Sequence, residues 1–431
     1  MNAALPTNGL KDRQGRPVVA VTGIGVITSL GQGLADNWAA LTAGKSGIHR
    51  IGRFATENLK TTIAGSVEYL HSEPVLPVVL TERLAREAAE EAVAMAKIGS
   101  KGRFPGPLFM AIPPVEVEWS TRRKLFGAPG PVAGDIYTRM IGAVGALNAA
   151  EDDLTVYAGV SEAIAERFGT EGLPISLTTA CASGGTAIQL GIEAIRRGDC
   201  TAALVVGADG SIQAESLIRF SLLSALSTAN DVPQEAVKPF SKNRDGFVMA
   251  EGAGALVLEE YGAAKARGAN ILAILAGSGE KADDFHRTRS KPDGSAIIAT
   301  IRNALEDAGL APEAIDYVNA HGTGTPENDK MEALSLEAVM GTRMRSVPIS
   351  SNKSMVGHTL TAAGAVEAVF TIQTIRSGTI PPTINYRVPD PSIELDVVPN
   401  TARAAPVRTA LSNSFGFGGQ NVCLVVAAEP A

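Results

Sequence analysis

The chain has 431 residues, of which 45% are hydrophobic and 19% are charged, so it can bury a large core as two subdomains or one duplicated domain. Its formal net charge of −7 excludes the global basic field that attracts nucleic acid or an anionic membrane. Three cysteines are too few for a disulfide framework and no CxxC pair indicates zinc, so we expect a metal-free globular protein of a reducing cytoplasm.

We expect neither a secretory signal nor a membrane span. Residues 1–16 have no apolar segment of the length that a signal needs, and we interpret them as a polar lead-in. Residues 172–192 carry no charge, but Pro174, Gln189 and several glycines and threonines interrupt them, which argues against a membrane-spanning helix.

Apolar runs bounded by glycine alternate with helical patterns along the chain. The clearest predicted strands and helices are, in chain order, strands at 18–27, 203–209, 255–260, 271–277 and 317–322 and helices at 81–97 and 294–308. Strands interleaved with helices predict an α/β fold whose sheets are covered on their faces by helices.

Two predicted helices resemble each other at a separation of 180 residues. The first ends in GIEAIRRG and the second in TIQTIRSG. Aligning their final glycines pairs these positions: Gly184 with Gly364, Ile192 with Ile372, Ile195 with Ile375, Arg196 with Arg376 and Gly198 with Gly378. This echo indicates a duplicated fold, and chance agreement between two Ala/Gly-rich helices is the alternative.

Cys181 lies in the segment TTACASGG, directly before a predicted amphipathic helix. Unpaired backbone N–H groups at a helix start stabilise a thiolate, so we expect a lowered pKa and a reactive sulfur. Its small neighbours let a substrate carbonyl approach and let backbone donors face an oxyanion. On this segment alone a buried structural cysteine remains the alternative, and we interpret Cys200 and Cys423 as structural.

Two of the five histidines, His321 and His358, stand in glycine-rich loops, NAHGTGTP and SNKSMVGHTLTAAGAVE. Such loops often carry the reactive side chains of α/β enzymes, and an imidazole there can donate a hydrogen bond to an enolate or transfer a proton. Each histidine alone could instead satisfy local backbone groups. A pair between Lys353 and Glu367 would orient the second loop, with a solvated surface contact as the alternative.

Other catalytic motifs lack their minimal parts. The segment VTGIGVITSLG has Thr28 where the dinucleotide-binding pattern GxGxxG requires glycine. The chain contains no Walker A, HExxH or GxSxG sequence, so phosphate-loop, zincin and serine-hydrolase mechanisms are not predicted.

Four segments together resemble the signature segments of the β-ketoacyl-[acyl-carrier-protein] synthases, and more narrowly their elongating Cys-His-His group. They are TACASG around Cys181, NAHGTGTPENDKMEA around His321, SNKSMVGHTLTAAGAVE around His358 and LSNSFGFGGQN at residues 411–421. Similarity is nearly continuous over residues 176–426.

The resemblance implies the thiolase-like fold, with duplicated α/β halves that form a five-layered αβαβα core. On this basis residues 17–262 would be the half that carries the nucleophilic cysteine. Residues 263–431 would be the half that carries the two histidines.

The resemblance also implies the chemistry of a 3-oxoacyl-[acyl-carrier-protein] synthase, an acyltransferase of fatty-acid elongation. Cys181 would attack an acyl thioester, and His321 and His358 would stabilise the enolate formed as malonyl-carrier protein loses carbon dioxide. The product is a 3-oxoacyl chain two carbons longer, and no cofactor is needed. Further roles follow by resemblance: Lys353 and Glu367 support the histidines, and the substrate-binding residues are Thr323, Thr325, Phe415, Phe417 and Gly418.

The implied partners are acyl carrier protein, loaded with acyl or malonyl groups, and a second copy of the chain. Carrier proteins are acidic and this chain is itself negative, so docking requires a local basic cluster. The candidates, each with a solvated charge as the alternative, are Lys238, Lys242 and Arg244, and the triple basic run Arg122, Arg123 and Lys124. The dimer contact is expected at residues 175–179.

Residues 70–171 depart from the family pattern, although in the family this region contributes to the acyl pocket and to both contact surfaces. Elongation of specialised or very long chains is therefore one hypothesis, and a polyketide-type ketosynthase is another. A non-condensing partner subunit that shapes a pocket would lack the nucleophile. A degradative thiolase would carry another cysteine in the loop NSFGFGG, which has none.

Overall fold

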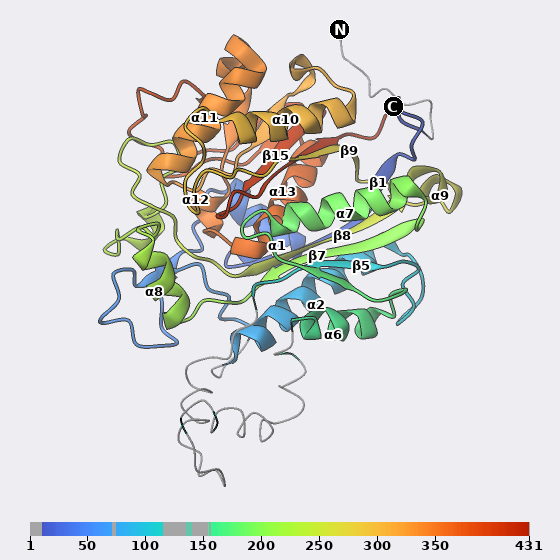
Figure 1. Cartoon of the computed structure of the whole chain (residues 1–431), viewed down its shortest axis with the longest axis horizontal. Helices are drawn as coiled ribbons and strands as arrows, with labels where there is room; N and C mark the ends of the chain where they lie inside the picture. The colour runs from blue at the N-terminus through green and yellow to red at the C-terminus, as the bar shows by residue number, and fades with distance from the viewer. Residues whose placement is uncertain are drawn as a thin grey trace.

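The computed structural model of the chain describes residues 11–70, 75–114, 135, 138, 154 and 157–430 (Figure 1). Its longer strands are β1 (Val19–Thr28), β5 (Leu108–Ala111), β6 (Ile175–Leu177), β7 (Ala202–Asp209), β8 (Gly252–Glu260), β9 (Ala273–Glu280), β10 (Tyr317–Asn319), β11 (Pro348–Ser350), β15 (Thr409–Phe415) and β16 (Asn421–Ala427). Two-residue strands are β2 (Gly31–Gln32), β3 (His49–Arg50), β4 (Ile63–Ala64), β12 (Thr379–Ile380), β13 (Asp396–Val397) and β14 (Arg403–Ala404).

The helices are α1 (Gly33–Thr42), α2 (Pro77–Ala96), α6 (Gly159–Phe168), α7 (Ser183–Arg197), α8 (Ala214–Leu222), α9 (Tyr261–Ala266), α10 (Ser295–Ala308), α11 (Pro326–Met340), α12 (Lys353–Val356) and α13 (Ala363–Ser377). Short 3₁₀ turns lie at Pro233–Glu235, Pro312–Ala314, Gly341–Ser346 and Leu360–Ala362.

Every strand and helix predicted from the sequence is present. Residues 172–192 form β6, a turn and part of α7. Within the part of the chain that the structure describes, no helix has both the length and the apolar character needed to cross a membrane.

The main sheet contains the same strand order twice. Its path is β13-β11-β10-β15-β16-β9-β1-β8-β7-β5-β6, so the order β1-β8-β7-β5-β6 recurs as β9-β16-β15-β10-β11. In both units the first two pairings are antiparallel and the next two are parallel. The units join where β1 pairs with β9. The duplication is therefore real, whereas the division at residue 262, which falls within α9, stays a prediction.

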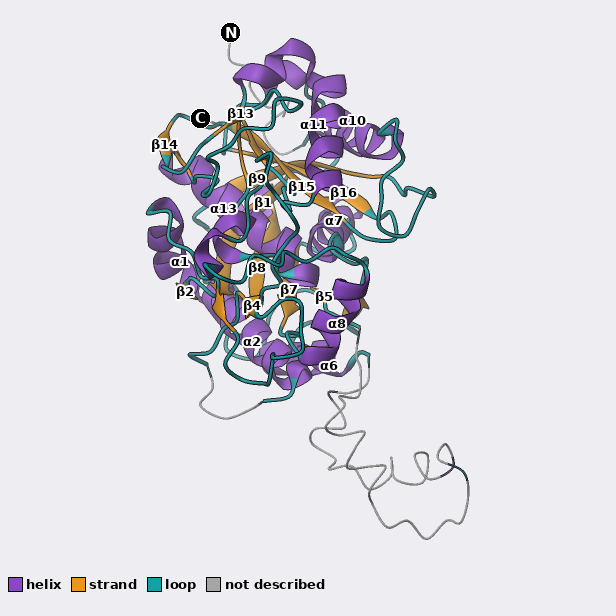
Figure 2. Cartoon of the chain, turned by 90° about the vertical axis from the view of Figure 1, so that its left-hand side faces the viewer, coloured by secondary structure: helices purple, strands orange, loops and turns teal. Residues whose placement is uncertain are grey.

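Helices and sheet form five layers (Figure 2). Helix α2 packs on β1, β7 and β8, with α6 beside it, and covers the outer face of the first unit. Helix α10 packs on β9 and β16, with α11 beside it, and covers the second. Helices α7 and α13 contact each other between the two halves of the sheet. Because α13 has sheet on both sides, it is buried on nearly every face.

The close approach of α7 and α13 depends on two glycines. A Cβ atom on Gly184 would lie 2.4 Å from the backbone nitrogen of Ala365, and one on Gly364 would lie 2.4 Å from that of Gly185. Gly184 and Gly364 are equivalent positions in the 180-residue repeat. The two copies of the fold therefore meet at backbone contact.

Gly184→Ala should lower the free energy of unfolding by about 1–3 kcal/mol, because the methyl group forces the two central helices apart. Alanine otherwise stabilises a helix relative to glycine by about 1 kcal/mol. A net loss of stability in Gly184→Ala therefore shows that the steric contact between the helices outweighs this preference. Urea denaturation measures it. Gly52→Ala is the control, since nothing lies within 4 Å of a Cβ atom there. Equal midpoints for Gly184→Ala and wild type would contradict the contact.

Candidate active site

Cys181 lies in the turn between β6 and α7, two residues before the helix begins. The preceding Ala180 has φ of 50°, in the left-handed region that non-glycine residues rarely occupy. Ser183 braces this turn, because its hydroxyl accepts from the Thr179 backbone N–H at 2.7 Å and donates to the Ala180 carbonyl at 2.6 Å. The sulfur is therefore held in place by a strained, hydrogen-bonded turn.

The expectation of a lowered pKa for Cys181 is wrong for the free protein. Cys181 is only 7% exposed, and burial raises the pKa of its thiol to about 11. The Lys353 charge and the Phe417 backbone N–H act in the opposite direction and do not compensate. At neutral pH the residue is a thiol, so its proton must leave as the sulfur attacks.

His321 follows β10 and His358 follows α12, and the two imidazoles lie together although 37 residues separate them in the chain. Their ring centroids are 5.4 Å apart, nearly perpendicular. Both are buried, and burial together with the Lys353 charge lowers both pKa values well below 6.5. The pair is therefore neutral at physiological pH.

Hydrogen bonds assign the tautomer of each ring. The backbone N–H of Leu360 donates to His358 Nδ1 at 3.3 Å. The Lys353 ammonium nitrogen lies 3.4 Å from His321 Nδ1, and because an ammonium is only a donor, this nitrogen accepts. A neutral ring whose Nδ1 accepts carries its proton on Nε2. Both histidines thus have an Nε2–H group available as a donor.

The charged pair predicted from the sequence is present, and it is buried. Lys353 and Glu367 form an ion pair whose side chains are 2% and 4% exposed. Burial raises the pKa of Glu367 to about 7, against the neighbouring Lys353 charge. These exposures exclude the alternative of a solvated surface contact. The pair places a fixed cation beside His321.

Sequence reasoning missed Glu332, which holds the His321 loop. Its carboxylate, on α11, accepts from the backbone N–H groups of His321 at 2.9 Å and Gly322 at 2.8 Å. The Asn413 side chain donates to it at 3.0 Å. Glu332 lies in the segment NAHGTGTPENDKMEA. Predicting a helix for the second part of this segment would have placed the Glu332 carboxylate on the side that faces the His321 loop.

One cavity contains the three reactive side chains. Cys181, His321 and His358 line it together with all five predicted binding residues, namely Thr323, Thr325, Phe415, Phe417 and Gly418. The two threonine hydroxyls are 2.9 Å apart. Exposed residues of the segment 286–290, including Arg287 and Arg289, line the same cavity. The only signal in the sequence that pointed to segment 286–290 was the similarity of this segment to the family pattern.

A second cavity of about 480 Å³ begins at the same cysteine. Cys181 and Phe417 line both cavities, so Phe417 lies between them. The wall of the second cavity is mainly apolar, with contributions from Val78, Ile112, Val160, Phe220, Leu223 and Leu360. The sulfur therefore stands where a polar entrance meets an apolar pocket.

The predicted docking cations have different environments. Arg244 is 6% exposed and pairs with Asp390 at 2.6 Å, and this geometry argues against a docking role because the guanidinium is already bound. Lys242 is exposed, whereas Lys238 is half-buried. Lys238 lies beside the first cavity, because a Cβ atom on Gly324, between the two cavity-lining threonines, would be 3.5 Å from the Lys238 backbone nitrogen. Arg122, Arg123 and Lys124 lie outside the described residues, as do residues 115–134 and 139–153 of the atypical segment 70–171.

A duplicated α/β fold with a buried cysteine before a central helix and two buried histidines in the same cavity defines a ketosynthase of the thiolase fold. Comparison with protein-family models agrees. The N-terminal domain of the beta-ketoacyl synthases matches residues 16–77 and 134–264, and the C-terminal domain matches residues 272–387. The chain belongs to the beta-ketoacyl synthase family.

Curated relatives and solved structures extend this comparison to nearly the whole chain. The 3-oxoacyl-[acyl-carrier-protein] synthase 2 of Coxiella burnetii is 36% identical, over 95% of this chain and 98% of that protein. The Synechocystis protein of the same name is 35% identical, over 94% and 97%.

Two solved structures share the fold over 96% of this chain and 100% of theirs. One comes from a complex of a type II polyketide acyl-carrier protein with its ketosynthase bound to a hexaketide, with a TM-score of 0.85 and 32% identity. The other is a beta-ketoacyl synthase from Burkholderia phymatum, with a TM-score of 0.79 and 34% identity.

Proposed function

We propose that the chain is an elongating 3-oxoacyl-[acyl-carrier-protein] synthase. The observation that carries this proposal is the position of Cys181, which shares one cavity with His321 and His358 and opens on its other side to an apolar pocket. Acyl chains would occupy the apolar pocket, and the carrier's prosthetic arm would enter past the histidines. We place the activity in the cytoplasm, because all three cysteines are unpaired, which fits a reducing compartment.

The first half-reaction transfers the acyl group to Cys181. The sulfur attacks the thioester carbonyl, the bond to the carrier's sulfur breaks, and the thiol proton ends on the released carrier thiol. The Phe417 backbone N–H faces the Cys181 sulfur, and Gly416 lies so close that a Cβ atom there would be 3.2 Å from the Cys181 nitrogen. The N–H groups of Cys181 and Phe417 would hold the oxyanion.

The second half-reaction uses the histidines. Malonyl-carrier protein loses carbon dioxide while the Nε2–H groups of His321 and His358 donate to the thioester oxygen, which becomes the enolate oxygen. The enolate carbon then attacks the acyl-cysteine carbonyl, the bond from this carbon to the Cys181 sulfur breaks, and the released thiolate takes a proton from water to regenerate the thiol. Neutral imidazoles suit this role because their Nε2–H groups are much weaker acids than an imidazolium and therefore hydrogen-bond the enolate without protonating it, and the Lys353 cation stabilises the developing charge.

A polyketide-type ketosynthase is the second candidate, supported by the fold shared with the hexaketide-bound ketosynthase. The two candidates differ in the chain that occupies the apolar pocket. Intact-mass measurement of the acyl-enzyme after exposure to carriers of graded alkyl length tests them. Efficient acylation by alkyl chains supports elongation of fatty acids, and a preference confined to medium chains removes the hypothesis of specialised long chains.

We propose that an acidic carrier protein docks beside the mouth of the first cavity. Charge reversal by Lys238→Glu should raise the KM for carrier-bound substrate about two- to fivefold, the size expected for one rim charge. Acylation by a small pantetheine thioester should not change.

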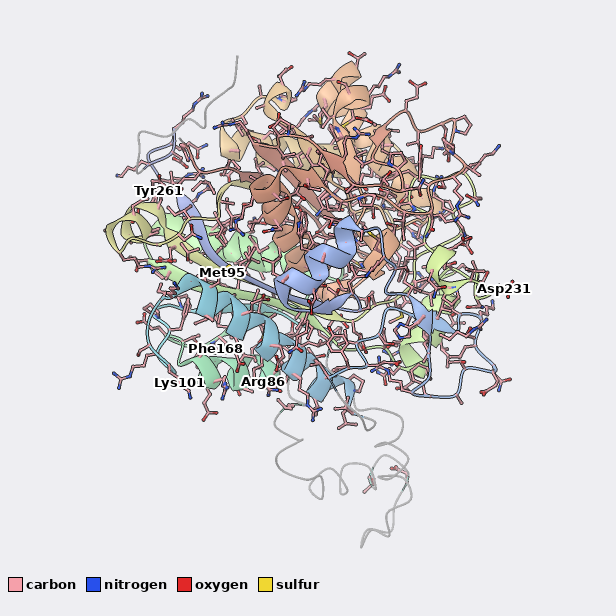
Figure 3. The ribbon with its side chains drawn as sticks, turned by 180° about the vertical axis from the view of Figure 1, so that it is seen from behind. Arg86, Met95, Lys101, Phe168, Asp231 and Tyr261 are labelled. Carbon is pink, nitrogen blue, oxygen red and sulfur yellow. The ribbon has the colours of Figure 1, made fainter. Side chains whose placement is uncertain are left out.

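Lys101→Glu is the matched control for docking. Lys101 is exposed, lines neither cavity and lies five residues beyond the C-terminal end of α2, whose other end lines the second cavity (Figure 3). That 20-residue helix is about 30 Å long. An equal loss with carrier-bound and small substrates in Lys238→Glu would refute docking there.

We propose that β6 mediates a homodimer. It ends the path of the sheet, so its outer edge has no partner strand among the described residues. Leu173 beside it is 87% exposed and Ile175 within it is 45% exposed, and an unpaired apolar edge favours pairing with a second copy. Light scattering should give twice the mass of the chain. A stable and active monomer would contradict the proposal.

A further inference from the structure

The second cavity has a polar strip on its otherwise apolar wall. Gln213, Ser216, Phe220 and Leu223 line it at spacings of three and four residues, which places them on one face of α8 and its ends. Gln213 and Ser216 lie at the start of this face and Phe220 and Leu223 at its end, where the exposed Arg219 also lines the cavity. A chain bound in the cavity therefore meets hydrogen-bonding groups along part of its length.

Most neighbouring polar side chains in this wall are already satisfied. The Thr361 hydroxyl donates to Asp209 at 2.7 Å and the Ser211 hydroxyl donates to the same carboxylate at 2.5 Å. The Thr81 hydroxyl donates to the Pro77 carbonyl at 2.8 Å. These groups have little left to offer a ligand.

Ser216 and Gln213 differ from them. Neither side chain makes a hydrogen bond with any residue that the structure describes, although Ser216 is only 9% exposed and Gln213 is half-buried. A hydroxyl inside a helix can bond back to the carbonyl one turn earlier, as Thr371 does to Glu367 at 2.7 Å in α13, but Ser216 lies in the first turn of α8, where no helical turn precedes it. The Ser216 hydroxyl lacks this bond and lines the cavity instead.

A purely alkyl chain would cover these two groups without replacing their bonds to water. Burying a hydroxyl or an amide unpaired is unfavourable, whereas an oxygen on the chain would satisfy both groups, since each can donate and accept. Apart from the satisfied groups named above, Thr178 and Arg219, the rest of the described wall is apolar, so most of the chain is hydrocarbon.

We infer that the cavity selects acyl chains that carry an oxygen substituent, a hydroxyl or a ketone, at the depth of Ser216, where Ser216 and Gln213 bind it. The inference rests on the proposed function, because it requires the acyl group to occupy the second cavity. It names the substrate class of that pocket: a long hydrocarbon chain interrupted by one polar group. Ser216 and Gln213 are specificity residues and take no part in bond making.

The test compares rates of Cys181 acylation for carrier-bound chains of one length. One chain is saturated, and the others have a hydroxyl or a keto group moved along the chain. In the wild type, one position or two adjacent ones should be preferred about three- to tenfold over the saturated chain, the effect of one added hydrogen bond. Comparing the two series shows which oxygen group is favoured.

Variants then assign the preference to the polar strip. Ser216→Ala and Gln213→Leu should each reduce the ratio of the oxygenated to the saturated rate, and the double variant should bring it to one. Ser221→Ala is the matched control, because Ser221 lies on the same helix but does not line the cavity. Its preference should remain. Circular dichroism shows that each variant is folded.

Two results would overturn the inference while leaving the proposed function intact. One is a saturated chain that reacts as fast as every oxygenated isomer in the wild type. The other is a preference that survives in the double variant. Failure of every chain, saturated or oxygenated, to acylate Cys181 would instead overturn the proposed function, and the inference with it.

Discussion

Cys181→Ala should abolish both acyl-enzyme formation and condensation, with a loss on the order of 10⁴-fold or more. Among the residues that the structure describes, no other nucleophile lines both cavities, and water cannot replace a covalent acyl carrier at that point. Decarboxylation of malonyl-carrier protein should persist, because the two histidine donors and the Lys353 cation are unchanged. This one variant therefore separates acyl transfer, which it loses, from decarboxylation, which it keeps.

Intact mass measures the acyl-enzyme, and release of labelled carbon dioxide measures decarboxylation in the same sample. Cys200→Ala is the matched control, because Cys200 is half-buried, is absent from both cavity walls and should leave both activities unchanged. The division of labour is wrong if Cys181→Ala stops decarboxylation as completely as it stops condensation.

His321→Ala and His358→Ala should show the opposite pattern. Each removes one preorganised donor from the developing enolate, so decarboxylation should fall by about 10²–10³ in rate. Acylation of Cys181 should continue, because the backbone N–H groups of Cys181 and Phe417 hold the oxyanion in that step. The protein should still fold, since Lys353 keeps its ion pair with Glu367 when His321 is shortened.

His49→Ala controls for the loss of an imidazole as such. His49 bonds to Ser66 at 2.8 Å and lines neither cavity, so both half-reactions should stay near the wild-type rate. Circular dichroism checks the fold of each variant. If both active-site variants decarboxylate at the wild-type rate, His321 and His358 do not stabilise the enolate.

Division of labour between side chains has a structural basis in the duplicated fold. Cys181 begins the central helix of the first unit, whereas the two histidine loops belong to the second. The close packing at Gly184 and Gly364 brings the N-terminal ends of α7 and α13 together. A change that separates these helices is therefore expected to impair activity as well as stability.

Local features of the sequence were sufficient to predict the elements and the reactive residues. Strand and helix periodicity is a short-range property, so every predicted element was found. Cys181, His321 and His358 stand in short glycine-rich segments whose composition already indicates loops, although His358 follows the short helix α12 and not a strand. The two helices that are 180 residues apart resemble each other in sequence because α7 and α13 occupy equivalent and sterically restricted positions.

Long-range packing decided the properties that the sequence could not supply. Burial raised the pKa of Cys181 against the effects of the Lys353 charge and the Phe417 backbone N–H, and it made Lys353 and Glu367 a buried pair and not a surface contact. It also bound Arg244 to Asp390 and left Ser216 without a partner in the cavity wall. Desolvation and hydrogen-bond satisfaction depend on every element that packs around a group. They are therefore determined only when the tertiary structure forms.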